Sequence, residues 1–534
     1  MRKSYIKVKA AFLAVTMLFM ASCGEEWLNI NEDPIQPSEA QLDLLLPAIQ
    51  GAMAWGLNDQ INEGTSIYIQ HFYGLAFSRY EQSTASYSES WEELFAGSLQ
   101  DLEVFIPTSE QDSLYLYSGV GKLHKAYIYS LIIDMWGAAP YSEAFQGLAN
   151  QQPQFQSGEA VYDSVFALID EGLADFARDE SGIVPSADMM YGGDAEAYVA
   201  QYTQFANTLL LKLYNQIRLY DETRARTGIT ALLDADSSFI ASNDDDFQFN
   251  YGTNQAPLNR HPLYVNSYAS GKTYYMNNYF MNALITNNDP RLPYYIYRQD
   301  LSDPEGDNLP CETVDCPYGY QGNGYTGRDH GDPSGLPPDD AIRAVFGVYP
   351  VGGKYDAGQG DEAEVGDGGQ GAGILPLLTN FMHHFILAEA ALTLGVSEDP
   401  RVQLEEGIRA SMSKVVDYSV SVDEAAANNY DADVVNDGIE AYVADVLDRY
   451  DNASASGKLD VVMTEAHKAL FGNGFEAYNN YRRTGYPSAL PPSISPFLAD
   501  DEFVLRLPMS VAEIQGNSNA PTELVTTPVF WDIN

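Results

Sequence analysis

Apolar residues recur at the spacing of an α-helix over most of this 534-residue chain. The segment 159–177 places six apolar residues on one face of a helix: Val161, Val165, Leu168, Ile169, Leu173 and Phe176. The segment 112–137 is dense in Leu, Ile and Tyr and stops at Gly137, shortly before Pro140, as helices commonly do. Similar patterns predict further helices over 195–219, 379–394, 401–417, 437–449 and 458–483.

This succession of helices predicts an all-α fold, with a core of tetratricopeptide-like helix pairs of the α-solenoid type. No strict repeat of about 34 residues is visible, so we do not expect a regular array. We assign the helical core to residues 39–240 and 375–490, and a C-terminal tail to 491–534.

Between residues 240 and 375 the pattern changes, because Asn, Asp, Gly, Pro and Tyr replace long periodic apolar segments. A long irregular insertion on a helical scaffold is where binding residues usually lie, so we expect a large loop-rich, ligand-binding subdomain here. The run 356–373, rich in Gly, Asp and Glu, could hold structural calcium through its carboxylates. It lacks the spacing of a known calcium loop, which favours a mobile solvated loop, and no other cofactor is expected.

The N-terminus has the pattern of an exported lipoprotein. Four basic residues within the first nine precede the apolar stretch 10–21, which is too short to span a bilayer. It ends in Met-Ala-Ser-Cys at 20–23, which resembles the lipobox at which bacterial lipoproteins are cleaved and acylated. We therefore predict a signal peptide at 1–22, lipid attachment at Cys23 and a short strap over 23–38.

The net charge of the chain excludes some classes of binding partner. The formal net charge is −47, and removal of residues 1–22 makes it −47 − 4 = −51, which argues against nucleic-acid binding. Cys311 and Cys316 are the only cysteines besides Cys23, and outside the cytoplasm they predict a disulfide that closes a small loop. A metal site there is disfavoured because no second Cys or His pair lies nearby. His383 and His384 lie in an apolar helix and are interpreted as packing residues.

Candidate chemistry is aromatic rather than catalytic. None of the common hydrolase, phosphate-binding or zinc motifs is present. The chain has 37 tyrosines, many beside Asn, Asp, Gln and Arg, a combination that suits stacking on sugar rings and bonding of their hydroxyls. We expect some of eight tyrosines in the loop-rich part to be exposed: Tyr264, Tyr268, Tyr274, Tyr275, Tyr279, Tyr294, Tyr295 and Tyr297.

Several segments, in order, resemble the SusD/RagB family, in particular its second, SusD-like branch. They are CGEEWLNINEDPIQPSEA (23–40), YSESWEELFAGSLQDL (87–102), KLHKAYIYSLIIDMWGAAPYSEAF (122–145), NDPRLPYYI (288–296), FILAEAALTLG (385–395), ALFGNGFEAYNNYRRTGYPSAL (469–490) and TPVFWD (527–532). The turn 136–144 and the stretch 476–487 are the most specific. We interpret both as scaffold, with Glu476, Arg482 and Arg483 forming ion pairs that brace the last helix.

The resemblance implies a single SusD-like domain over 39–534, in a surface lipoprotein of Bacteroidetes. Such a protein captures an oligosaccharide without cleaving it and works as a lid over a SusC-like TonB-dependent outer-membrane transporter. Glu25 and Glu26 resemble the acidic signal that directs these lipoproteins to the outer face of the outer membrane. The chain departs from the family at 382–384, where Met-His-His stands in place of Tyr-Ala-Glu, and the ligand loops match no family motif.

The first candidates for the ligand site are Arg79, Tyr80 and Trp91, because they flank the polar loop 81–90. A second group of candidates is Tyr264, Tyr268, Tyr274 and Tyr275. Two alternatives stay open. One is the same role with peptide cargo, which aromatic and amide residues would serve equally well. The other is a surface glycoside hydrolase, which would need a carboxylate pair about 5–10 Å apart in a cleft.

Overall fold

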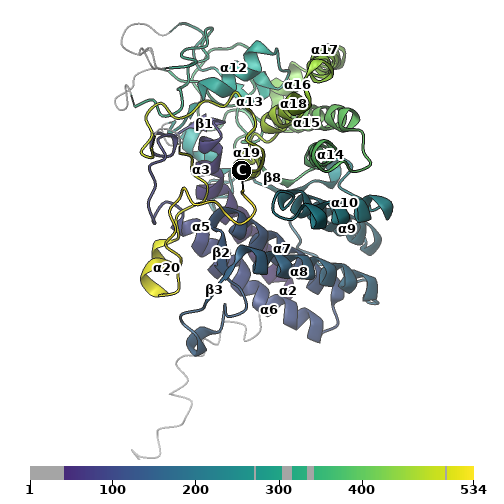
Figure 1. Ribbon diagram of the computed structural model, residues 1–534. Coiled ribbons are helices and arrows are strands. Elements are labelled where there is room, and N and C mark those ends of the chain that lie inside the picture. The colour runs from purple at the N-terminus through teal and green to yellow at the C-terminus, as the bar shows by residue number, and fades with distance from the viewer. Residues whose placement is uncertain (1–40, 270–271, 304–315, 334–341, 500–501, 534) are drawn as a thin grey trace, which may run out of the picture.

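The computed structural model describes residues 41–269, 272–303, 316–333, 342–499 and 502–533. The prediction of an all-α fold is confirmed: helices form a continuous stack, and the strands are short pairs. In Figure 1 the stack begins with α2 and α6 at the bottom and continues through α7, α8, α9 and α10. It ends with α14, α15, α17 and α18 at the upper right. The loop-rich part lies at the upper left, and the C-terminal tail (yellow) descends along the left side.

The N-terminal third of the stack contains α2 (Leu42–Gly56), a π-helical turn η2 (Leu57–Ile61), α3 (Asn62–Tyr68), α4 (Leu75–Ser78), α5 (Ser88–Glu92), the π-helical η3 (Glu93–Leu99), α6 (Gln100–Gln111), α7 (Tyr115–Trp136) and α8 (Gly158–Arg178). The central pair is α7 and α8, joined through the antiparallel strands β2 (Ala138–Pro140) and β3 (Phe155–Ser157). Gly119 and Gly172 allow the two backbones to approach closely, because a β-carbon at either would meet the opposite helix. The helix-to-loop turn at 136–140 is therefore scaffold, as expected.

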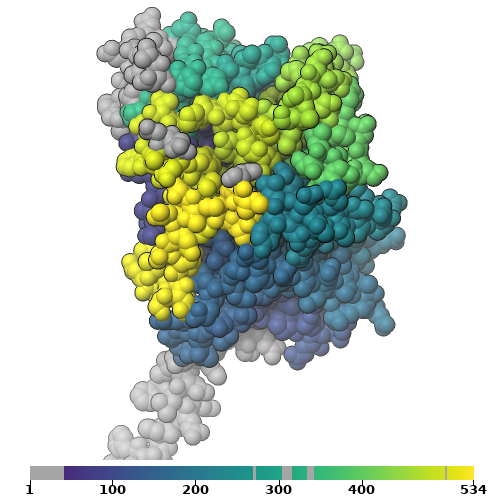
Figure 2. All heavy atoms as spheres, viewed as in Figure 1, coloured from purple at the N-terminus to yellow at the C-terminus, as the bar shows by residue number. Residues whose placement is uncertain are grey.

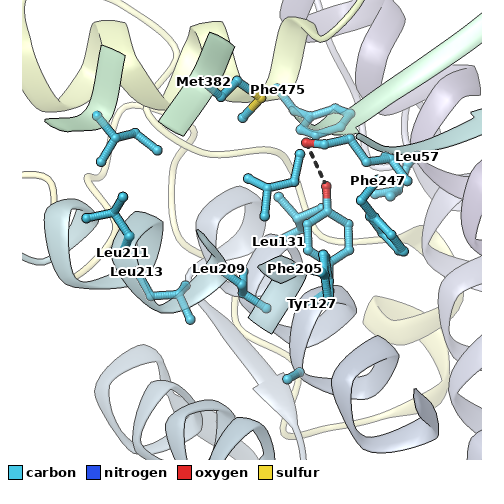
Figure 3. Close-up of a cluster of buried hydrophobic side chains, with 14 of the residues drawn as sticks. Leu57, Tyr127, Leu131, Phe205, Leu209, Leu211, Leu213, Phe247, Met382 and Phe475 are labelled. Atoms are coloured by element: carbon cyan, nitrogen blue, oxygen red, sulfur yellow. Dashed lines mark hydrogen bonds between the residues drawn. The ribbon is translucent and has the colours of Figure 1, made fainter. Parts of the chain in front are cut away.

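The principal core lies where these helices meet the next set: α9 (Ala195–Gln216), α10 (Glu222–Asp234), α14 (Asn380–Leu394), α15 (Pro400–Val422), α16 (Glu424–Asn428), α17 (Ala432–Asn452), α18 (Ala455–Ala469) and α19 (Gly474–Thr484). Figure 3 shows Tyr127 of α7 beside Phe205 and Phe247 in this core. The ring centroids of Phe205 and Phe247 are 4.1 Å apart, and the Tyr127 hydroxyl donates to the Leu377 carbonyl at 3.3 Å. Burial of large rings with a satisfied hydroxyl stabilises the contact between layers.

One predicted helix is divided in the structure. The segment 458–483 contains α18 and α19, separated at Gly472, which has φ +97. Asn473 then caps α19, accepting a hydrogen bond from the backbone N–H of Glu476 at 3.2 Å. The apolar pattern continues across the break, so periodicity alone could not reveal it; the left-handed Gly and the capping Asn decide where the helix stops.

We expect Gly472→Ala to destabilise the protein by about 1–3 kcal/mol, because alanine disfavours positive φ and its β-carbon would collide with the ring of Pro350. Gly438→Ala in α17 is the matched control. No atom lies within 4 Å of its β-carbon position, so it should stabilise the helix by about 0.5–1 kcal/mol. Urea unfolding of both variants tests this, and equal midpoints would contradict it.

The loop-rich part begins after β4 (Phe247–Asn250) and ends at β8 (Ile374–Leu378), and these two strands pair with each other. It contains α11 (Pro262–Tyr264), η6 (Val265–Ala269), β5 (Tyr275–Met276), α12 (Asn278–Thr286), α13 (Leu292–Tyr295), β6 (Ile296–Tyr297) and β7 (Val345–Phe346); β5 pairs with β1 (Phe72–Tyr73), and β6 with β7. A second hydrophobic core forms inside it.

The expectation that some of its eight tyrosines are exposed is wrong, since all eight are at most 7% exposed. The physical reason is that their rings fill this second core while several hydroxyls reach buried acceptors. The Tyr295 hydroxyl donates to the Lys468 carbonyl at 3.1 Å, and that of Tyr297 to the Asp361 carbonyl at 2.8 Å. A tyrosine whose hydroxyl is satisfied in this way can be buried completely.

The Gly/Asp/Glu run is tied to the loop-rich part by ion pairs and backbone hydrogen bonds. Asp361 and Asp367 both contact the Lys354 ammonium, at 2.6 and 3.3 Å, and Gly369 donates to the Gly353 carbonyl at 2.9 Å. Much of the run is exposed to solvent, as expected, but these contacts tie it to the loop-rich part, so it is not a free loop. In the described part of the chain, no three His, Cys, Asp or Glu side chains gather as a metal site would require.

Buried charges connect the last helix to the stack. Arg483 of α19 contacts Glu389 of α14 at 2.6 Å, and Arg218 contacts the same carboxylate at 2.9 Å. Glu476 instead pairs with Lys212 at 2.6 Å. The expected bracing by ion pairs is thus present for Glu476 and Arg483, although their partners lie on other helices.

Arg482 braces the same helix through the backbone. It donates to the carbonyls of Leu505 and Asp134 at 2.6 and 2.7 Å, and its guanidinium lies 4.7 Å from the ring of Trp531. The side chain thus joins α19 to the C-terminal tail and to α7.

Some predictions fall on parts of the chain that are not described: the signal peptide, Cys23, the strap 23–38 and Cys311. Cys316 is disulfide-bonded. His383 stacks on Phe239 with ring centroids 5.4 Å apart, so its interpretation as a packing residue is confirmed. Among the described helices, none is long and apolar enough to cross a bilayer.

Candidate functional site

An exposed aromatic ring lies where loop 74–87, which includes the short helix α4, meets the C-terminal tail. Phe497 is 56% exposed, and the guanidinium carbon of Arg79 lies 4.5 Å from the centre of its ring. The Phe497 backbone N–H donates to the Arg79 carbonyl at 2.7 Å, which holds the two residues side by side. We call this pair, with the adjoining loop, the Arg79–Phe497 site.

The tail is fastened along this loop by a row of hydrogen bonds. The Ser493 hydroxyl donates to the Ser78 carbonyl at 2.7 Å, and the Ile494 N–H donates to the His330 carbonyl at 3.0 Å. Figure 2 shows the C-terminal residues (yellow) covering much of one face, with segments from the N-terminal third at their edge. The site therefore combines residues more than 400 positions apart, since 497 − 79 = 418.

Arg79 is half-buried, with its Nε 3.4 Å from the Ser495 carbonyl, and Glu81, Ser83 and Thr84 further along the same segment are exposed. An apolar ring with a planar cation beside it can stack on a sugar ring and bond the hydroxyl groups at its edge. The arrangement has the chemistry of a recognition surface for a neutral polar ligand.

Tyr80 and Trp91 lie behind this surface rather than on it. Tyr80 is buried, has φ +60, and packs against Tyr68, His330 and Phe503. Trp91 is 2% exposed and stacks on Phe95 with centroids 4.4 Å apart. Of the first three predicted ligand residues, Arg79 alone reaches the surface. The rings of Tyr80 and Trp91 instead pack into the core beneath segment 74–87.

The second group of predicted residues is also buried. Tyr264 and Tyr268 stack on each other with centroids 4.7 Å apart, and the guanidinium of Arg343 lies 3.7 Å from the ring of Tyr275. Tyr274 hydrogen-bonds Glu63, whose pKa is raised to about 7 by burial, with the neighbouring Asp59 carboxylate adding to the rise. These tyrosines shape the loop-rich part from inside.

Phe497 is the residue that the sequence did not predict. It lies in the irregular tail, in the context Ser-Pro-Phe-Leu, where neither helical nor alternating periodicity assigns a face. The signal that could have indicated an exposed ring was an aromatic residue next to Pro, in a tail without a helical pattern. Its exposure follows from the contact of the tail with loop 74–87, which local sequence cannot specify.

Two buried glutamates of the helical core, Glu389 and Glu476, have shifted pKa values but do not form a catalytic cleft. Glu389 and Glu476 line a cavity of about 20 Å³, which has room for roughly one water molecule. Burial alone would raise the pKa of Glu389, but the guanidinium groups of Arg483 and Arg218 outweigh it and lower the pKa to about 2. Because no sugar could enter this cavity, the two glutamates serve the scaffold.

A stack of helix pairs with a loop-rich face and an exposed aromatic–arginine site defines a helical ligand-binding protein. The chain belongs to the second SusD-like family, described as starch-binding and associating with the outer membrane, whose profile matches residues 34–508. The predicted resemblance is thus confirmed. No curated protein sequence matches the chain.

Solved structures share the fold over nearly the whole chain. A chitin-binding protein is 20% identical, with a TM-score of 0.70, and the match covers 92% of this chain and 100% of that one. A SusD/RagB family protein from Bacteroides thetaiotaomicron is 19% identical, with a TM-score of 0.70 and coverages of 93% and 99%. A chitin-binding SusD homolog from Flavobacterium johnsoniae is 19% identical, with a TM-score of 0.65 and coverages of 92% and 99%.

Proposed function

We propose that this protein captures oligosaccharides at the cell surface and delivers them to a SusC-like TonB-dependent transporter in the outer membrane, without cleaving them. The observation that carries the proposal is the half-exposed Phe497 ring with the Arg79 guanidinium beside it, in a chain of a family described as starch-binding. Stacking and hydroxyl bonding at this site need no bond cleavage.

The N-terminal sequence supports the location. A lipid on Cys23, followed by Glu25 and Glu26, would anchor the protein on the outer face of the membrane, and the strap 23–38 would let it move over its transporter. The strongly acidic surface suits a neutral cargo better than a polyanionic one, because it repels anions.

We expect Phe497→Ala and Arg79→Ala each to weaken oligosaccharide binding by about tenfold, equivalent to ~1.4 kcal/mol, because each removes one face of the site. Both side chains are at least partly exposed, so the fold should persist. Calorimetry with chitin and starch oligosaccharides measures the effect, since solved relatives and the family description name these glycans. Tyr430→Ala and Arg401→Ala are the matched surface controls, expected to bind as the wild type does.

The same binding experiments distinguish the proposed function from its two alternatives, a glycoside hydrolase and a peptide-binding protein. Release of shorter sugars during incubation with labelled glycans would contradict the non-catalytic role. Binding of peptides but of no glycan, with loss of binding in Phe497→Ala, would transfer the role to peptide cargo. Glycan affinities that neither variant alters would show that the Arg79–Phe497 site is not the ligand site.

A further inference from the structure

A second pocket lies on the helical stack, away from the loop-rich part. Its volume is about 210 Å³, and it is lined by α8, the α9–α10 connection, α10 and the C-terminal tail. Figure 2 shows the yellow tail meeting the blue helices on this face. We call it the Tyr220 pocket; its lining includes Tyr220, Phe530, Phe166, Glu159, Asp163, Asp221 and Arg224.

Two aromatic rings form one side of the pocket. Tyr220 is 49% exposed and makes an edge contact with Phe530, with ring centroids 5.2 Å apart. Phe530 is held in turn by Tyr162, at 5.0 Å, and by the fully buried Trp531 that follows it in the chain. The Trp531 indole N–H donates to Asp134 at 2.9 Å, so the tail that carries Phe530 is anchored in the core. The rings are thus presented by a rigid support.

Charged groups complete the lining of the pocket, and they too are positioned by the fold. The Arg224 guanidinium lies 4.4 Å from the centre of the Phe166 ring and bonds Asp163 at 2.6 Å. Asp221 caps α10 by accepting from the backbone N–H of Arg224 at 2.9 Å. Glu159 is only partly buried, at the start of α8. Donor and acceptor groups therefore converge beside the aromatic rings.

We propose that the Tyr220 pocket binds one unit of a neutral sugar. Its volume of about 210 Å³ is ample for a single six-membered ring. Three carboxylates against one guanidinium repel an anionic sugar. A neutral polyol suits both kinds of group, because each hydroxyl can donate to a carboxylate and accept from the guanidinium. The inference rests on the proposed function for its class of ligand and adds a second site to it.

The test uses monosaccharides, which can occupy the pocket without spanning two sites. Saturation-transfer NMR and calorimetry compare glucose, N-acetylglucosamine and galacturonic acid on the purified protein. We expect the two neutral sugars to bind at least tenfold more tightly than galacturonic acid. Tyr220→Ala should weaken neutral-sugar binding at least tenfold, Tyr220→Phe should retain most of it, and Tyr430→Ala, a tyrosine that is 42% exposed elsewhere, should leave it unchanged.

The outcomes separate the two proposals. Equal affinity in Tyr220→Ala and the wild type, tighter binding of galacturonic acid than of glucose, or no binding of any of the three sugars would each overturn the Tyr220 pocket. Phe497→Ala should leave the Tyr220-dependent signal intact while it weakens oligosaccharide binding. If Phe497→Ala leaves oligosaccharide binding unchanged, the Arg79–Phe497 site fails while the Tyr220 pocket stands.

Discussion

Replacing Glu389 by alanine is expected to lower the free energy of unfolding by about 3–5 kcal/mol. The carboxylate is buried between the guanidinium groups of Arg218 and Arg483, at 2.9 and 2.6 Å, and each of these bonds joins α14 to another part of the stack. Without it, two buried cations would face each other with no counter-charge. The same change removes the tie between α19 and α14, so loss of cooperative unfolding is expected to accompany the loss of stability.

The control is Glu440→Ala, which removes a carboxylate that also contacts an arginine, Arg409 at 2.5 Å, but on the surface. Its cost should be about 1 kcal/mol or less, because water solvates both charges in either state. Urea unfolding followed by circular dichroism measures both variants. Equal losses in the two would show that burial does not set the strength of the Glu389 interaction.

Mild acid is expected to destabilise the protein strongly, because its histidines are buried in neutral form. Burial lowers the pKa of His261, His330 and His383 to about 3 and that of His467 to about 4. Each folded pKa lies below the ordinary value of about 6.5, so this stability is present above pH 6.5 and is lost as the pH falls towards 3–4. Between pH 6.5 and 5.5 each histidine costs about 1 kcal/mol.

A carboxyl group acts in the opposite direction. The raised pKa of Glu63, about 7, stabilises the folded state as the pH falls through 7 towards its unfolded value near 4.5, and offsets part of the loss. These five groups together should therefore cost about 2–3 kcal/mol between pH 6.5 and 5.5. Burial also lowers the pKa of His71, which adds to the loss, and the urea midpoint should fall. His330 has no hydrogen-bond partner at either ring nitrogen, so His330→Gln should make the fall shallower. A constant midpoint across this pH range would contradict the interpretation.

The helices could be predicted from the sequence because amphipathic spacing is a local property. Segments 159–177 and 195–219 correspond closely to α8 and α9, whose bounds are Gly158–Arg178 and Ala195–Gln216. The break between α18 and α19 at Gly472 could not be predicted from the sequence, since apolar residues continue on both sides of it. Its position depends on the packing of Pro350 against the glycine, a contact that comes from a distant part of the chain.

The exposure of the candidate ligand residues was predicted only in part. Arg79 reaches solvent as expected, whereas Tyr80 and Trp91 are covered by the tail and by neighbouring helices. Whether an aromatic ring is exposed depends on what packs over it, and here the covering residues come from the other end of the chain. Phe497 and Tyr220, two rings that do face solvent, lie in a tail and a short connection where no pattern assigns a side.

By itself the sequence determined the all-α class, the positions of most helices, the lipoprotein leader as a prediction and the resemblance to the SusD/RagB family, because each depends on neighbouring residues or on ordered motifs. The tertiary structure alone decided which aromatics are core and which are surface, which charges pair, and where pockets lie. The physical reason is that exposure and ion pairing are properties of contacts between distant segments. Arg79 with Phe497, and Tyr220 with Phe530, come together as candidate sites only when the C-terminal tail packs on the helices.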